Sequence, residues 1–296
     1  MSDTIDAGAA GTWQLGDLTV NRMGYGAMQL FISGGGRLDR DQAIAVLRRA
    51  VELGVNHIDT AAFYYSALRS SNELISTALQ PYPDDLVITT KVGPARGPDR
   101  EFRPEARPEE LRSQVEENIR QLGRDHLDVV NLRLGQALDR GAGSLADRFG
   151  VLAELQQEGL IRHLGISNVS PEHLAEAQAI APVVCVQNQY GLTARREDDR
   201  LVRMCAEQKV AFVPFFAIAS GGEHPVVQAV ADDHGVSSAQ VRLAWTLHQG
   251  PNVLAIPGTG SVAHLEDNIA AASLRLSGEE LARLDGVNGD ETGLGK

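Results

Sequence analysis

The amino-acid sequence predicts an α/β protein, a (β/α)8 TIM barrel with a short N-terminal β-hairpin. Short apolar runs rich in β-branched residues alternate along the chain with amphipathic segments of helical period. Strands that alternate with helices form a parallel sheet, and eight such units suit a closed barrel. No Pro- or Ser-rich linker interrupts this pattern, so residues 1–296 are predicted to form a single domain.

The expected elements follow one another in a regular order. The hairpin is expected over residues 12–20, with its turn at Gly16-Asp17. Strands are expected at 22–30, 55–60, 86–91, 127–134, 161–166, 183–187, 210–216 and 253–256. Helices are expected at 39–54, 70–79, 108–122, 144–158, 171–180, 198–208, 225–234, 238–248, 262–272 and 277–284. A doubly wound sheet is the alternative, but no GxGxxG motif follows the first strand.

Composition excludes several classes of function. The net charge of −12 argues against a nucleic-acid partner, because no basic stripe is present to neutralise phosphates. Cys185 and Cys205 lie in apolar patterns typical of reduced core residues, and no ligand spacing predicts a metal site. No apolar run reaches 18 residues and the N-terminus lacks signal-peptide features, so a cytoplasmic protein without a membrane partner is predicted. Residues 1–11 are expected to form a mobile tail, and the protein to be a monomer or weak homo-oligomer.

Lys91 is the most informative single residue. The run from Leu86 to Thr90 is apolar and β-branched, as in a strand buried on both faces, and it ends in this lysine. The chain has only three lysines, and the other two are Lys209 and the C-terminal Lys296. Because barrel active sites lie at the C-terminal ends of the strands, Lys91 is predicted to be functional.

Other polar side chains end the neighbouring strands. Asp59 ends the second strand and Tyr64 follows in its loop. A carboxylate can orient the lysine ammonium, and the ammonium favours proton release by the tyrosine, which suits a general acid. Phe215 and Phe216 end the seventh strand, where alternation predicts that one faces the core and the other the site.

Five segments, in order, resemble the aldo-keto reductase superfamily between about residues 18 and 284. They are HIDTAAFYY followed by Asn72-Glu73, then ITTKV, LIRHLGISN, VCVQNQY and IPGTGSVAHLEDN. The resemblance implies a barrel enzyme that reduces the carbonyl group of a small molecule with NADPH or NADH. Asp59, Tyr64 and Lys91 match three members of the family's catalytic tetrad, and Tyr64 is preferred to Tyr65 by its distance from Asp59.

The resemblance also implies a cofactor site. Ser167, Asn168 and Gln187 match the residues that hold the nicotinamide carboxamide, and amide side chains suit a carboxamide. Phe215 falls where the family often stacks a tyrosine on the nicotinamide ring. First-strand and adenosine-phosphate contacts are implied at Ala27, Met28, Gly258, Thr259, His264, Asp267 and Asn268, and Asp59 is expected to contact the cofactor as well.

Two positions depart from the family pattern. The fourth tetrad member is usually a histidine, and Arg133 stands there, five residues after Asp128. An arginine can position and polarise a carbonyl group but cannot give up its proton. Many relatives hold a 2′-phosphate with basic residues at the positions of Gly258 and His264. NADPH is nevertheless the expected cofactor, ahead of NADH.

Three functions remain open at this point. The first is a reductase that converts an aldehyde or ketone to an alcohol with Tyr64 as general acid. The strand LDVVNLR resembles more loosely a bacterial subgroup that includes pyridoxal-reducing enzymes. The second is a non-catalytic, nicotinamide-binding regulatory subunit on the same fold. The third is a barrel glycosidase, which needs a carboxylate pair, whereas the strand ends offer Asp59 alone.

Overall fold

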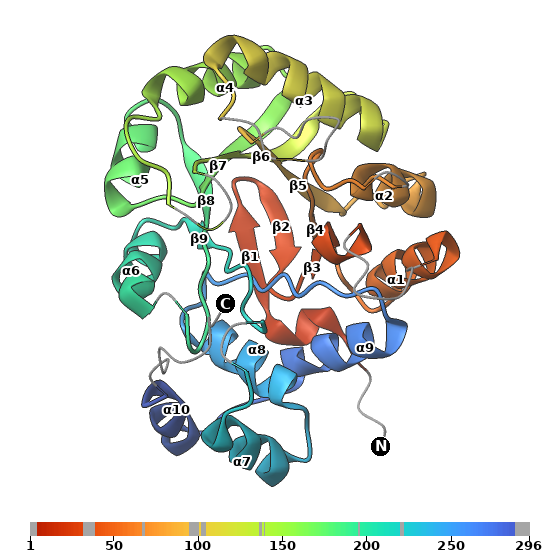
Figure 1. The fold of residues 1–296 in the computed structure, drawn as a ribbon, viewed down its shortest axis with the longest axis vertical. Helices are drawn as coiled ribbons and strands as arrows, with labels where there is room; N and C mark the ends of the chain where they lie inside the picture. Colours follow the sequence, from red (N-terminus) through yellow and green to blue (C-terminus); the bar gives the residue numbers. More distant parts are fainter. Residues whose placement is uncertain are drawn as a thin grey trace.

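The structure is a computed structural model. It describes residues 5–31, 39–66, 69–94, 101, 105–135, 138, 140–194, 196–219 and 222–287. Within these ranges the chain forms a ring of parallel strands with helices outside it (Figure 1).

The sheet contains seven consecutive parallel strands in the described ranges. Their runs are apolar and almost fully buried, as expected for strands covered on both faces. Pairing of Met23 with Ala255 and of Phe212 with Val253 joins its two edges and closes the barrel. The strands are β3 (Tyr25–Gly26), β4 (His57–Asp59), β5 (Val87–Val92), β6 (Leu127–Arg133), β7 (Ile161–Ser167), β8 (Val183–Gln187) and β9 (Ala211–Phe212). The predicted (β/α)8 fold is confirmed.

Three of the predicted strands are wrong in extent. The first is only two residues long, because the chain turns into a 3-10 helix at Ala27–Leu30. The seventh ends at Phe212, and the segment predicted as the eighth, 253–256, forms only isolated pairs with its neighbours. Gly24 and Gly26 lie within the first segment, Pro214 lies within the seventh and Pro257 follows the eighth, and these residue types weaken a regular ladder.

Ten α-helices lie among the described residues. Seven have a capping Ser, His or Asp side chain at the N-cap, consistent with the turn sequences that precede them. They are α1 (Arg40–Glu52), α2 (Ser71–Leu79), α3 (Pro108–Leu122), α4 (Ala146–Gln157), α5 (Pro171–Gln178), α6 (Asp199–Glu207), α7 (Pro225–His234), α8 (Ser238–His248), α9 (Val262–Ala270) and α10 (Gly278–Asp285).

The N-terminal hairpin closes the base of the barrel. Its strands β1 (Thr12–Leu15) and β2 (Leu18–Asn21) are antiparallel, as predicted, and project onto the centre of the ring in Figure 1. Leu15 and Val20 are fully buried in one cluster with inward residues of the ring, among them Val87 and Val129. The hairpin therefore serves as the floor of the barrel interior.

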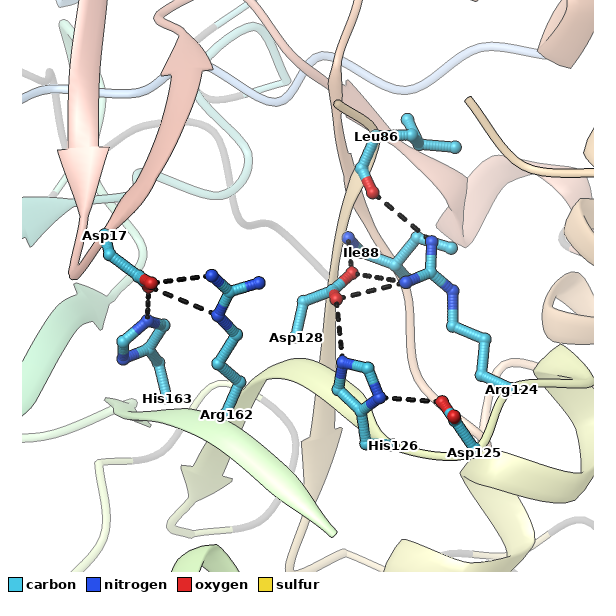
Figure 2. Close-up of polar contacts among 9 residues, drawn as sticks. All are labelled: Asp17, Leu86, Ile88, Arg124, Asp125, His126, Asp128, Arg162 and His163. Carbon is cyan, nitrogen blue, oxygen red and sulfur yellow. Dashed lines mark hydrogen bonds and ion pairs between the residues drawn. The ribbon is translucent and has the colours of Figure 1, made fainter. Parts of the chain in front are cut away.

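Two groups of polar contacts fasten this base (Figure 2). Asp17, at the hairpin turn, accepts hydrogen bonds from Arg162 and contacts His163 Nε2 at 2.6 Å. Gly16 precedes Asp17 and has φ +66°. A Cβ atom at this position would lie 2.2 Å from the His163 ring, so the close approach of the turn to His163 requires glycine. A second cluster joins Asp128 to the Ile88 amide (2.8 Å).

The N-terminal segment differs from the mobile tail that the sequence predicts over residues 1–11. Ala7–Ala10 form a 3-10 helix capped by the Asp6 side chain. Ala7 is fully buried, and its amide donates to the Leu53 carbonyl oxygen at 2.8 Å. Apolar burial and this hydrogen bond hold the segment against the helical layer, while residues 1–4 lie outside the described ranges. None of the helices that the structure describes is long and apolar enough to span a membrane.

Candidate active site

Side chains from five neighbouring strands meet at the C-terminal mouth of the barrel. Parallel pairing sets Lys91 beside Asn131, Arg133 beside Ser167, and Ser167 beside Gln187. Because side chains alternate along a strand, every second residue faces the interior, and these are the polar ones near the strand ends. The sequence-predicted strand-end residues are therefore neighbours in space.

Asp59 and Lys91 form a buried ion pair at this mouth. Lys91 Nζ lies 2.5 Å from Asp59 Oδ1 and donates to the Thr60 carbonyl oxygen at 3.0 Å. The two side chains are only 3% and 5% exposed. Burial lowers the pKa of Lys91, but the Asp59 carboxylate and Tyr64 outweigh burial, so its pKa is raised. The ammonium therefore stays charged at neutral pH.

A chain of buried amides and hydroxyls supports this pair from behind. Thr60 Oγ1 donates to Asn72 Oδ1 (2.7 Å), and Asn72 Nδ2 donates to Asn118 Oδ1 (3.0 Å). Thr90 Oγ1 donates to the same Asn118 oxygen at 2.6 Å. Asn118 on α3 thereby connects the residue after Asp59 with the residue before Lys91, and all four polar side chains are fully buried. This network fixes the two strand ends relative to each other.

Tyr64 lies in the loop after β4 and is held by aromatic contacts. Its ring stacks on Phe31 with centroids 5.6 Å apart and meets Phe63 edge-on at 5.2 Å. Lys91 Nζ lies 5.0 Å from the centroid of the Tyr64 ring. The predicted set of Asp59, Tyr64 and Lys91 is thus brought together in one place.

Arg133 ends β6 on the same side. Its Nη1 donates to Ser167 Oγ at 3.3 Å, and its guanidinium carbon lies 5.2 Å from the centroid of the Phe215 ring. Burial lowers the pKa of Arg133, whereas attraction to Tyr64 and Asp59 opposes that effect. The group remains a cation, because an arginine side chain stays protonated throughout the physiological pH range.

The three residues expected to hold a carboxamide each have a different environment. Gln187 Nε2 donates to Asp59 Oδ2 at 2.7 Å, while Gln187 Oε1 is buried without a hydrogen-bond partner. Asn168 has φ +63°, and its side chain donates to the Leu134 carbonyl oxygen at 2.9 Å. Ser167 accepts the hydrogen bond from Arg133.

A cavity of about 590 Å³ opens beside the Asp59–Lys91 pair and is called the main cavity below; Ser167, Asn168 and Gln187 are absent from its lining. Of the predicted site residues it is lined by Met28, Asp59, Tyr64, Lys91, Arg133, Phe215 and Gly258. Its other walls are Gly26, Gln29, Phe31, Phe63, Pro94, Glu105, Gly135, Leu138, Pro214, Phe216, Ala217, Ile218, Ala219, Ile256 and Pro257. Phe215 and Phe216 both face it, so the expected alternation is wrong: β9 has ended, and Phe216 has φ +61°.

The other predicted cofactor residues lie away from this lining. Ala27 is fully buried, and its carbonyl oxygen accepts from Ser71. Gly258 does line the cavity, and it packs so closely that a Cβ there would lie 2.5 Å from the Gly26 oxygen.

The segment after Gly258 leads onto α9. Thr259 is buried, and its carbonyl oxygen accepts from Tyr25 Oη at 2.6 Å. His264 is exposed in the first turn of the helix, and Asn268 is buried further along it. Asp267 accepts from Ser237 Oγ at 2.6 Å. Asp267 thus joins α9 to α8 through its carboxylate.

Several residues of the site and its supporting network were not identified from the sequence. Phe31 and Glu105 belong to loops that follow strands, and Glu105 is bound by Arg148 and the Gly135 amide. Phe63 lies inside the HIDTAAFYY motif, so its position next to Tyr64 could have been used to predict it as a site residue. Asn118 lies on α3, and the one feature of the sequence that could have identified it is that it is a polar residue on the buried face of that helix. Among the described residues, no group of three His, Cys, Asp or Glu side chains could hold a metal ion.

Comparison with known proteins agrees with this geometry. The chain is 48% identical over 288 residues to a pyridoxine 4-dehydrogenase of Escherichia coli K12, covering 95% of this chain and 99% of the relative. It resembles the crystal structure of a thermostable aldo-keto reductase bound to the inhibitor epalrestat (28% identity, TM-score 0.77, 93% of this chain and 98% of that one). It also resembles a Klebsiella pneumoniae aldo/keto reductase bound to NADP and acetate (27% identity, TM-score 0.75, 93% of each chain).

The family assignment rests on almost the whole barrel. The model of the Aldo/keto reductase family matches residues 22–225 and 223–289. These ranges contain every strand of the ring and every predicted site residue. The resemblance seen in the sequence is confirmed: the chain belongs to the aldo/keto reductase family and is a nicotinamide-dependent oxidoreductase that acts on carbonyl groups.

Proposed function

We propose that this enzyme reduces an aldehyde to a primary alcohol with Tyr64 as the proton donor, and that pyridoxal is a substrate. The observation that carries the proposal is the contact of Tyr64 with the buried Asp59–Lys91 pair at the wall of the main cavity. A pyridoxine 4-dehydrogenase with 48% identity supports the choice of substrate, because oxidation of pyridoxine at that position gives pyridoxal.

The residues present fit a nicotinamide cofactor. The buried Gln187 Oε1 has no hydrogen-bond partner, and a carboxamide N–H is the kind of donor it can accept. We assign Ser167, Asn168 and Gln187 to the carboxamide and Phe215 to the nicotinamide ring. When bound, the cofactor supplies the hydride that the chain itself cannot supply.

The chain's own residues orient the carbonyl group and supply the proton. Asp59 holds the Lys91 ammonium, and the Asn118 network keeps both strand ends in place. Tyr64 donates its hydroxyl proton to the carbonyl oxygen of the substrate as that oxygen becomes an alkoxide. The adjacent ammonium stabilises the tyrosinate that remains, which favours proton release. Phe31 and Phe63 hold the Tyr64 ring in place and exclude water from it.

NADPH is the proposed cofactor. The structural relative from Klebsiella pneumoniae binds NADP, and a second structure from that organism contains NADPH. In this chain His264 is exposed at the start of α9, where a charge on its imidazole would attract a 2′-phosphate. Assays with NADPH and NADH in parallel therefore belong to the test below.

Tyr64→Phe tests the mechanism. Loss of the hydroxyl removes the proton donor and leaves the ring, so turnover of pyridoxal should fall by about 10² or more. The measurement is NADPH oxidation with pyridoxal, alongside binding of NADPH to each variant.

Tyr65→Phe is the matched control, because it removes a hydroxyl from the neighbouring residue, which is absent from the lining of the main cavity. It should leave turnover within about threefold of the wild-type value. A tenfold change in rate would need a change of about 1.4 kcal/mol in the activation free energy. Undiminished turnover by Tyr64→Phe would remove Tyr64 from the mechanism. Failure of the wild-type protein to oxidise NADPH or NADH with any aldehyde would remove the proposed function.

A further inference from the structure

Arg133 is a cation in the wall of the main cavity, on the same side as Tyr64. Its guanidinium lies against Phe215 and donates to Ser167 Oγ. Tyr64 and Asp59 are the charged or ionisable groups whose attraction acts on it. A guanidinium offers five N–H donors in a planar fork and suits anionic oxygens.

The charges around the main cavity favour an anionic ligand. Asp59 is bound by Lys91, and Glu105 is bound by Arg148 behind the wall. The described side chains that line this cavity include two cations and two carboxylates (Lys91, Arg133; Asp59, Glu105), and Arg148 pairs with Glu105 from outside the lining. Each of these carboxylates is therefore bound by a cation other than Arg133, and a negatively charged substrate group near Arg133 would be attracted to its guanidinium in a partly buried site.

The rest of the wall favours a planar aromatic ring over a small aliphatic acid. Phe31, Phe63, Phe215 and Phe216 line the cavity together with Leu138 and Ile218. Rings packed edge-on or offset against such side chains gain contact energy beyond their buried area. A bound ring must also present its carbonyl oxygen to Tyr64 and its charge to Arg133, which both stand at the strand-end side of the cavity.

We propose that the substrates of this site are aromatic aldehydes with a hydroxyl group ortho to the aldehyde, and that Arg133 binds that hydroxyl as a phenolate. Ortho placement puts two oxygens on one edge of the ring, one for Tyr64 and one for Arg133. Pyridoxal belongs to this class, because its 3-hydroxyl lies beside its 4-aldehyde. The inference rests on the proposed function and deepens it by naming the feature of the substrate that is recognised.

The pairing also has a chemical consequence. An ortho phenolate donates electron density into the carbonyl group and makes the carbon a poorer hydride acceptor. A guanidinium on the phenolate oxygen withdraws that density and favours the reaction. Arg133 thus acts on both binding and reactivity, whereas the proton still comes from Tyr64.

Three hydroxybenzaldehyde isomers test the proposal, since they differ only in the position of the hydroxyl group. The wild-type protein with NADPH should show a kcat/KM for the 2-hydroxy isomer about tenfold or more above that for the 3- and 4-hydroxy isomers. In Arg133→Met the ratio between isomers should collapse to within about threefold, whatever happens to the common rate, because the charge-assisted contact is gone. Ile218→Val is the matched control: it changes the apolar wall and should alter all three isomers by a similar factor.

A binding measurement separates recognition from turnover. Protein, NADPH and 2-hydroxybenzyl alcohol cannot react, because both small molecules are already reduced. Ultraviolet difference spectra over a pH series report the phenolate of the bound alcohol. It should ionise at lower pH than the free alcohol with the wild-type protein, and this shift should be lost in Arg133→Met.

The outcomes distinguish this inference from the proposed function. Equal kcat/KM values for the three isomers, or an isomer ratio unchanged in Arg133→Met, would overturn the substrate class while the reductase assignment stands. Absence of turnover with every aldehyde would overturn the proposed function. In that case the titration of the bound alcohol still decides the role of Arg133: an unshifted phenolate would refute it.

Discussion

The C-terminal mouth of the barrel and the hairpin that closes its base place their ion pairs in different environments. At the C-terminal mouth, Asp59 and Lys91 are buried as a pair beneath the main cavity. At the base, the interior is apolar, and the charged contact of Asp17 with Arg162 lies on the surface. The buried pair at the mouth serves a reaction that benefits from a low-dielectric environment, whereas the ion pair at the hairpin turn is exposed to solvent. The base also buries one acidic residue, Asp128, beside Arg124.

The energetic consequences differ accordingly. A buried ion pair carries a large desolvation cost, so it adds little net stability. Removal of one partner, however, leaves the other charge buried without compensation, which destabilises the fold. An exposed ion pair is screened by solvent and is worth about 1 kcal/mol or less. At the base, stability comes instead from apolar side chains such as Leu15, which are completely removed from water.

Lys91→Met should give the largest effect in this comparison. It leaves the Asp59 carboxylate buried with Gln187 as its remaining side-chain donor, so unfolding free energy should fall by about 3–5 kcal/mol. Activity should also fall by about 10² or more, because the tyrosinate of Tyr64 loses its adjacent cation. Chemical denaturation and NADPH oxidation measure the two losses.

Lys209→Met is the control for that variant, because it removes an exposed lysine with the same side-chain length. It should change stability by no more than about 0.5 kcal/mol. If Lys91→Met were as stable and active as this control, the contrast between the two ends of the barrel would be refuted.

Leu15→Ala tests the contribution of the apolar floor at the base of the barrel. The side chain is fully buried in the cluster that the hairpin shares with the ring, so its truncation should cost about 2–5 kcal/mol. Well below the melting temperature, kcat should remain near the wild-type value, because the mouth is formed by the opposite ends of the strands. Thermal unfolding and steady-state kinetics check the two halves of the prediction, and a kcat lost in proportion to stability would contradict it.

Asp17→Asn should give the smallest effect. Hydrogen bonds from Arg162 and His163 hold the pKa of Asp17 well below its ordinary value, but the group is largely exposed. The loss of stability at pH 7 should therefore be below about 1 kcal/mol. Because the folded pKa is depressed, the contribution is present above the unfolded pKa of about 4 and is lost as pH falls through the folded value. Denaturation at pH 7 and pH 3 should show the difference from wild type shrinking, and a growing difference would contradict the sign.

Periodicity and strand-end chemistry predicted much of the site. A buried apolar run that ends in Lys91 identified the centre, and Asp59, Tyr64 and Arg133 followed from the ends of its neighbours. Parallel pairing then brings these residues together, because the C-terminal ends of all strands meet at one mouth. The N-terminal hairpin was also predicted, from its turn sequence and alternation.

Loops and helices contributed what could not be predicted in this way. Phe31 contacts Tyr64 from the position just after the strand predicted at 22–30, and Glu105 lines the cavity from the loop before α3. Phe216 faces the cavity only because its backbone takes a positive φ after β9 has ended. Such backbone turns depend on packing around them, and no repeating pattern in the sequence records them.

By itself, the sequence determined the order of strands and helices, the barrel they form and the polar residues at its mouth, because these follow from local periodicity. Tertiary structure alone decided that Asn118 on α3 joins the ends of β4 and β5, and that the hairpin closes the floor of the interior. Both contacts join residues far apart in the chain, and the free energy of such contacts depends on burial that exists only after the barrel has closed.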